Sequence, residues 1–153
     1  MSKYKELKGF FTPQVVAFYG ASNVMQKFGS LHLTNLLSAG FQGKVIPIHP
    51  KEEEIIGFRA YKSIQEVPEQ VDLVVIATPT EYINDILEDC GQKGVKFAIV
   101  LSGGFLEVGN VEGQERMKYI AETYGMKIMG PNCSGEVVAP DINITHVPWP
   151  PRK

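Results

Sequence analysis

The chain has 153 residues, a length that suits one globular domain. Its composition, 44% hydrophobic and 21% charged, argues against a wholly disordered chain. The net charge of −2 argues against a general nucleic-acid binder, which normally presents a basic face. Two cysteines are too few for a disulfide framework. The amino terminus lacks the apolar stretch of a secretion signal and no apolar run is long enough to span a membrane, so we expect a cytoplasmic protein.

Short apolar runs alternate with amphipathic stretches along the chain. The apolar runs predict buried strands at 15–19, 44–48, 71–77, 97–101 and 127–129. The amphipathic stretches predict helices over 28–39, around 82–90 and over 117–124, with Gly40 and Gly125 as carboxyl-terminal stops. Residues 52–68 make a longer connection, for which we predict a small hairpin and a short helix.

Strands separated by helices imply right-handed crossovers and a parallel sheet. We therefore predict an α/β fold, a single Rossmann-like doubly wound domain whose five-stranded, mainly parallel sheet has the order 3-2-1-4-5. Pro47 indicates that the second strand is not fully central. We predict that the domain covers residues 1–139. The proline-rich residues 140–153 are predicted to form a tail or the start of a linker to an absent domain.

Open α/β sheets bind ligands outside the carboxyl ends of their strands, where the strand order reverses. We expect this point between the first strand and the strand that ends at Ala77. The loop Gly20–Gly29 leads from the first strand into a helix, so its N–H groups and the helix dipole would face a phosphate. The loop departs from the G-x-G-x-x-G fingerprint because Ser22 replaces the second glycine, and it is not a Walker A loop. The alternative is a turn whose glycines serve only packing.

The residues after the second strand indicate the kind of nucleotide. A nicotinamide dinucleotide site would have Asp or Glu there, whereas this chain has His49, Pro50 and Lys51. Lys51 suits a phosphorylated ribose, which NADP and coenzyme A both carry; the alternative is a solvated surface lysine. No His/Cys cluster has metal-ligand spacing, so no metal site is predicted. Cys133 fits equally well a small buried residue or a residue near a ligand thiol.

Five segments of the chain form a wider pattern, and the last is the most specific: Val16–Ser22, Ile46–Lys51, Val71–Pro79, Gly104–Gly109 and Gly130–Gly135. They resemble, in order, the CoA-binding domain of the nucleotide-forming acyl-CoA synthetases. That group includes the succinyl-CoA synthetase alpha subunit and the ADP-forming acetyl-CoA synthetases, and the ADP-forming acetyl-CoA type is the more similar. The resemblance covers roughly residues 10 to 145.

The resemblance implies a coenzyme A site on five loops. The diphosphate would lie at the first loop, the 3′-phosphate near Lys51, the adenine and pantetheine along the third and fourth loops, and the thiol end near the last. The residues implied are Gly20, Ala21, Ser22, Lys27, Phe28, Gly29, Pro50, Lys51, Thr78, Pro79, Leu101, Ser102, Gly103, Asn132 and Cys133.

The resemblance also implies a function, namely a CoA-binding domain or subunit of an NDP-forming acyl-CoA synthetase. Such an acid–thiol ligase would be incomplete in this chain, because the phosphohistidine and nucleotide domains would come from further domains or a partner subunit. No catalytic residue is expected here. The alternatives are a stand-alone module that senses CoA or acyl-CoA and an NADP-binding redox domain, which the missing second glycine weakens. We also expect Gly20→Val to abolish CoA binding while leaving the fold intact.

Overall fold

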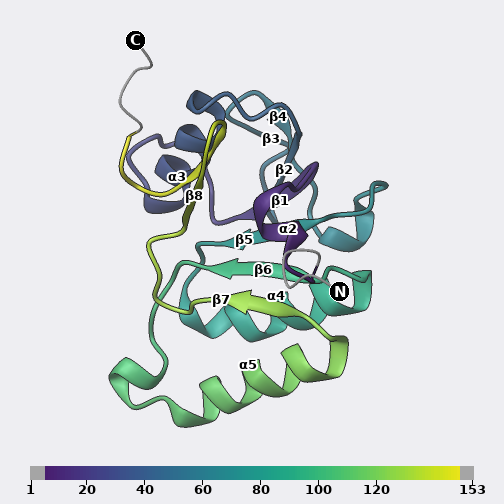
Figure 1. Cartoon of the computed structure of the whole chain (residues 1–153), viewed down its shortest axis with the longest axis vertical. Helices are drawn as coiled ribbons and strands as arrows, with labels where there is room; N and C mark the ends of the chain where they lie inside the picture. Colours follow the sequence, from purple (N-terminus) through teal and green to yellow (C-terminus); the bar gives the residue numbers. More distant parts are fainter. Residues whose placement is uncertain (1–5, 149–153) are drawn as a thin grey trace.

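The computed structural model describes residues 6–148. A parallel five-stranded sheet lies between two layers of helices (Figure 1). Helix α3 covers one face, and α4 and α5 cover the other. The predicted Rossmann-like α/β class, its strands and its three helices are therefore confirmed. The elements are β1 (Val15–Tyr19), α3 (Phe28–Ser38), β2 (Lys44–Ile48), β5 (Leu73–Ile76), α4 (Thr80–Lys93), β6 (Phe97–Val100), α5 (Val111–Tyr124) and β7 (Lys127–Met129).

Strand β1 shows why the strands read as continuous apolar runs. Val16 and Phe18 pack in the core beneath α3, whereas Ala17 and Tyr19 pack in the core beneath α4 and α5. All four side chains are at least nine-tenths buried. A strand with a hydrophobic core on each face needs apolar residues at every position rather than at alternate ones.

The predicted strand order is wrong. The sheet has the order β2-β1-β5-β6-β7, which is 2-1-3-4-5 in chain order, because β5 pairs with β1 rather than lying outside β2. Pro47 gives the physical reason. Its carbonyl faces the outer side of β2, where it accepts a hydrogen bond from the N–H of Tyr61 (3.1 Å). The N–H and the carbonyl of a strand residue point to the same side. The N–H that proline lacks would therefore also have faced the outer edge of the sheet. The order still reverses between β1 and β5, where the ligand site was predicted.

The connection from β2 to β5 holds the small hairpin and short helix that its length indicated. The hairpin consists of β3 (Glu54–Ile55) and β4 (Phe58–Arg59), and the short helix is η1 (Ile64–Glu66). Ile64 is fully buried in the core beneath α4. The connection therefore belongs to the packed domain.

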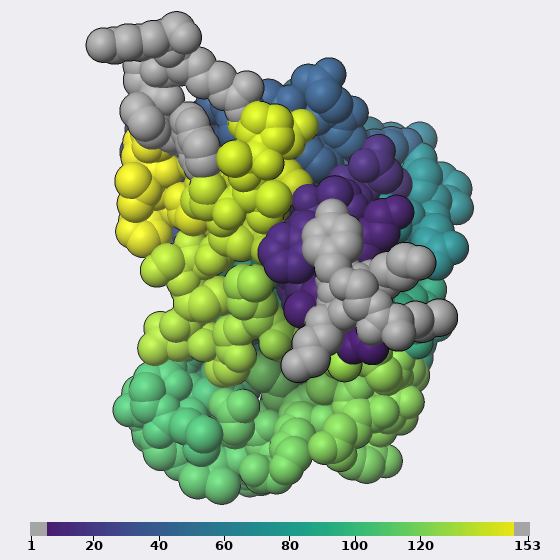
Figure 2. All heavy atoms as spheres, viewed as in Figure 1, coloured from purple at the N-terminus to yellow at the C-terminus, as the bar shows by residue number. Residues whose placement is uncertain are grey.

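Four further elements within residues 6–148 were not predicted: the one-turn helix α2 (Lys8–Phe11), the short helix η2 (Leu106–Val108), and the two strands of a hairpin, β8 (Glu136–Val138) and β9 (Ile142–Ile144). The hairpin packs against α3 through β9. Figure 2 shows the yellow carboxyl-terminal residues at the surface of the molecule. Ile142 and Ile144 are 5% and 0% exposed, so the packed structure continues past residue 139, the predicted boundary. Residues 149–153 of the predicted tail lie outside the described part. Across 6–148, no helix has the length and apolar character that a membrane span requires.

Candidate functional site

The predicted loops meet at the carboxyl edge of the sheet, each held to its neighbour by hydrogen bonds. The N–H of Asn132 donates to the carbonyl of Ser102 (2.9 Å), which joins the loop after β7 to the loop after β6. The hydroxyl of Thr80 donates to the carbonyl of Gly103 (2.7 Å), which joins the start of α4 to the same loop. The parallel strands thus bring residues that are far apart in sequence onto one continuous rim.

Two glycines allow close backbone approaches at the end of β1, Gly20 to the end of β5 and Gly29 from the start of α3. Gly20 has a φ of +90°, and a Cβ there would lie 2.5 Å from the carbonyl carbon of Ala77. A Cβ on Gly29 would lie 2.6 Å from the carbonyl carbon of Gly20. Real Cβ contacts are longer than these distances, so any side chain must displace backbone. This close approach argues against the expectation that Gly20→Val would leave the fold intact.

The loop between β1 and α3 has a fixed shape. The Ser30 hydroxyl accepts from the N–H of Ser22 (3.0 Å) and donates to the carbonyl of the same residue (2.8 Å). The Ser22 hydroxyl in turn accepts from the N–H of Val24 (3.2 Å). Ser22 therefore shapes the loop from within. Ser30 was not predicted, because a serine inside an amphipathic helix carries no signal of a partner eight residues earlier.

The start of α3 is suited to an anion. Lys27 is the N-cap residue, and its side chain makes no capping hydrogen bond to the first N–H groups of the helix. Its first turn also contains no acidic residue, so the positive end of the helix dipole is not neutralised there. Phe28 is 46% exposed and lies edge-on to the ring of His32 (centroids 4.4 Å apart). A phosphate with an attached flat group fits this combination.

Lys51 projects from a turn that is tied to the same loop. The Nδ1 atom of His49 accepts hydrogen bonds from the N–H groups of Lys51 (3.2 Å) and Glu52 (2.9 Å), so this histidine organises the turn. Asn23 connects the β1–α3 loop to the hairpin that follows, since its side-chain amide donates to the carbonyl of Glu54 (2.9 Å). Lys51 itself is exposed, as is Pro50 beside it.

Two of the predicted site residues, Ala21 and Leu101, are core residues, each 3% exposed. They offer a ligand backbone rather than side chains. Cys133 is partly buried against the same core. Its thiol donates to the carbonyl of Val100 (3.4 Å), and burial raises the pKa of this thiol. Thr78 and Pro79 lie on the rim, where Thr78 has a buried hydroxyl without a hydrogen-bond partner.

Glu136, at the start of β8, was not singled out from the sequence. Glu136 is 8% exposed, and its Oε1 atom is buried without a hydrogen-bond partner. Removal from water raises the pKa of this carboxyl from 4.5 to about 7. A single glutamate between a glycine and two valines has no sequence signature that distinguishes it from a surface residue.

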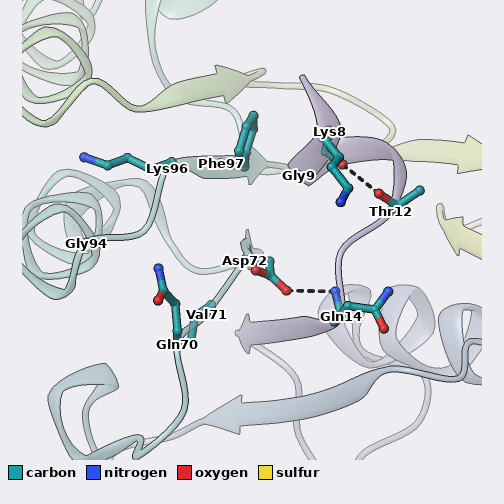
Figure 3. A pocket seen from close by; sticks show the side chains of 10 residues that line it. All are labelled: Lys8, Gly9, Thr12, Gln14, Gln70, Val71, Asp72, Gly94, Lys96 and Phe97. Carbon is teal, nitrogen blue, oxygen red and sulfur yellow. Dashed lines mark hydrogen bonds between the residues drawn. The ribbon is translucent and has the colours of Figure 1, made fainter. Parts of the chain in front are cut away.

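The opposite edge of the sheet has a cavity of about 290 Å³. Figure 3 shows its lining side chains, among them Lys8, Gln14, Asp72 and Lys96, around the amino ends of β1, β5 and β6. The Asp72 carboxylate accepts from the N–H of Gln14 (2.8 Å), so it serves to fix the start of β1. None of the predicted site residues lines this cavity.

Within residues 6–148, no group of three or more His, Cys, Asp or Glu side chains is arranged to hold a metal ion.

Comparison with known proteins is consistent with this geometry. A family described as CoA binding domain matches residues 14–138. The chain is 45% identical over 130 residues to an ADP-forming acetate–CoA ligase of Methanocaldococcus jannaschii, covering 85% of this chain. It is 42% identical over 150 residues to the alpha subunit of ADP-forming acetate–CoA ligase I of Pyrococcus furiosus, covering 93% of this chain.

A solved structure gives the same answer for the fold. The acetyl-coenzyme A synthetase 1 of Ca. Korarchaeum cryptofilum, solved with phosphate and ADP, superposes with a TM-score of 0.90 at 44% identity. The match covers 93% of this chain and 31% of that one. The chain spans only 18% of the Methanocaldococcus ligase and 32% of the Pyrococcus subunit, so most of each relative lies outside the matched segment.

Proposed function

Because the chain belongs to the CoA binding domain family, we propose that it holds coenzyme A for an ADP-forming acyl-CoA synthetase. The rest of that enzyme would be supplied by further domains or by a partner subunit. The chain would contribute binding and orientation of the thiol, which places the reacting sulfur and acyl group together. Two free cysteines, Cys90 and Cys133, support a reducing cytoplasm as its compartment.

The uncapped start of α3 is the observation that carries this proposal. An acid-free first helical turn, Lys27 at its N-cap and two glycines that bring the backbone close together suit the CoA diphosphate. Phe28, exposed beside this turn, offers an apolar face to the adenosine part of the ligand. From here, the rim of loops runs across β5 and β6 to Asn132, so an extended ligand would lie along it with its thiol at the far end.

Lys51 is proposed to select coenzyme A by its 3′-phosphate. Its turn is held by His49 and lies beside the β1–α3 loop through Asn23, so a ribose near α3 would come within reach of the ammonium group. A carboxylate at this position would repel the phosphate, whereas a lysine attracts it.

Two of the three histidines, His32 and His49, have structural roles that do not suit covalent chemistry. His32 is fully buried, its Nδ1 donates to the carbonyl of Phe28 (2.8 Å), and burial lowers the pKa of its ring. The Nδ1 atom of His49 accepts two backbone N–H groups. Both residues are thus used by the fold. A nucleophilic histidine needs an accessible ring nitrogen and a neighbour that activates it.

Calorimetric titration of the chain with CoA, dephospho-CoA and NADPH tests the proposal. CoA should bind roughly 10- to 100-fold more tightly than dephospho-CoA, because a charge-assisted contact contributes about 1.5–3 kcal/mol. Lys51→Gln should remove this difference, and Lys62→Gln, at an exposed lysine beyond the β3–β4 hairpin, should keep it. Failure to bind CoA would refute the function. Equal affinities for CoA and dephospho-CoA would remove Lys51 from the site, and displacement of CoA by NADPH would favour the redox alternative.

A further inference from the structure

The turn between β6 and α5 presents apolar side chains to solvent. It contains η2 (Leu106–Val108) and leads into α5. Leu106, Val108 and Val111 are 59%, 69% and 57% exposed, and we call these three residues the η2 surface. A single exposed apolar side chain is ordinary, but three within six residues form a patch of the kind found at protein interfaces.

Hydrogen bonds between side chains and backbone hold the η2 surface in place. The Glu107 carboxylate, the charged group of the turn, accepts from the N–H groups of Gly104 and Phe105 (3.2 Å to the latter). Asn110 donates to the carbonyl of Gly104 (3.0 Å) and accepts from the N–H of Gly113 (2.9 Å), which caps α5. Phe105 anchors the turn from below and is fully buried. The apolar side chains are therefore presented rigidly, which lowers the entropic cost of binding a partner.

The η2 surface adjoins the thiol end of the candidate site. A Cβ on Gly103 would lie 2.5 Å from a carboxylate oxygen of Glu107 and 3.3 Å from the side chain of Asn132. The base of the turn is thus in contact with the last two loops of the rim. In Figure 1 the turn projects between β6 and α5, on the side to which the strand arrows point. A protein domain bound to the η2 surface would therefore also face the loops of the candidate site.

We propose that the η2 surface is the docking site for the part of the synthetase that brings the acyl group to CoA. This inference rests on the function proposed above. The relatives carry more than two thirds of their length outside the matched segment, so an extensive partner exists in each of them. That partner must reach the thiol end of the ligand, and the η2 surface lies beside the loop of Asn132, where we propose that this end is held. It would fit an apolar hollow on the partner, with Leu106 and Val108 inserted.

The test uses the complete synthetase, purified from its source cells through a tag on this chain. A photoreactive leucine analogue in place of Leu106 should cross-link to synthetase polypeptide outside the CoA-binding segment. The double variant Leu106→Asp/Val108→Asp should lower kcat/KM for acyl-CoA formation by about 100-fold, the effect of losing two apolar contacts. Tyr119→Asp, at a 68% exposed position of α5, serves as the matched control and should have little effect.

Binding of CoA to the isolated chain separates this proposal from the one on which it rests. The double variant should bind CoA with unchanged affinity. Cross-links that join only two copies of this chain, or a double variant as active as the Tyr119→Asp control, would overturn the docking site. Loss of CoA binding by the double variant would overturn it too, because the η2 surface would then belong to the ligand site. A wild-type chain that fails to bind CoA would instead overturn the proposed function.

Discussion

Glu136 makes the stability of the domain depend on pH in a direction that one substitution can test. Its carboxyl is 8% exposed and Oε1 lacks a hydrogen-bond partner, so ionisation in the folded state is unfavourable. Burial raises its pKa from 4.5 to about 7. Between these two values the folded chain keeps a proton that the unfolded chain has released. The free energy of unfolding should therefore fall as the pH rises through this interval.

The size of the effect follows from the difference between the two pKa values. Each unit corresponds to about 1.4 kcal/mol, so the shift of Glu136 to about 7 amounts to about 3 kcal/mol when the carboxyl is fully ionised. Little of this cost is present at pH 4, and nearly all of it is present at pH 8. Glu136→Gln keeps the shape of the side chain but cannot ionise. The variant should therefore be more stable than the wild type at pH 8 by up to about 3 kcal/mol and close to it at pH 4.

Urea unfolding of both proteins at several pH values between 4 and 8 measures this difference. Subtracting the variant curve from the wild-type curve cancels the contributions of all other titrating groups, provided that they do not couple to Glu136. Glu115→Gln, at an exposed position of α5, is the matched control and should follow the wild type. Parallel curves for the wild type and Glu136→Gln would refute the reasoning, because the carboxyl would then be solvated or paired in the folded state.

Three other outcomes are expected. Gly20→Val should unfold the domain rather than only remove ligand binding, because its Cβ meets the backbone of Ala77. Gly40→Val is the control: Gly40 has a similar positive φ but open space around it, so this variant should remain folded in thermal melts. Similar melting temperatures for the two variants would contradict the close approach at Gly20. Ser30→Ala should weaken CoA binding by about 5- to 10-fold in calorimetry, since it releases Ser22 at a cost of about 1 kcal/mol; unchanged affinity would mean that the loop holds its shape without this bond. The chain alone should not incorporate label from γ-labelled ATP, and an acid-labile, base-stable label on histidine would show that a phosphoryl relay lies within it.

The five strands and three helices of the sheet could be predicted because their signals are local. A run such as 15–19 is apolar throughout since both of its faces are buried, and that property is visible without knowing its neighbours. The order of the strands is not local. Pro47 indicated that the second strand is not central. Only the pairing of β5 with β1 shows that β2 lies at the edge of the sheet. The β8–β9 hairpin was missed because its three-residue strands show no period and, unlike the equally short β7, do not follow a predicted helix.

The residues of the candidate site also fall into those that the sequence could indicate and those that it could not. Gly20 and Lys51 could be named as candidate site residues because ligands of doubly wound sheets lie at the carboxyl ends of the strands. The roles of Ser30 and Glu107 could not be read, since each depends on which backbone groups the fold brings to it. Cys133 shows that recognising a motif does not give the direction of a side chain within it. Its place in the most specific motif was clear, but the direction of its thiol toward Val100 was not.

The amino-acid sequence by itself therefore determined the fold class, the edge of the sheet where the candidate loops meet and the family resemblance. These depend on hydrophobic patterning and on short segments whose residues lie side by side in the chain. The tertiary structure alone decided the strand order, the burial of Glu136 and the outward direction of the η2 surface. Each of these depends on contacts between residues far apart in sequence, and no local pattern records whether such a contact removes a side chain from water or leaves it exposed.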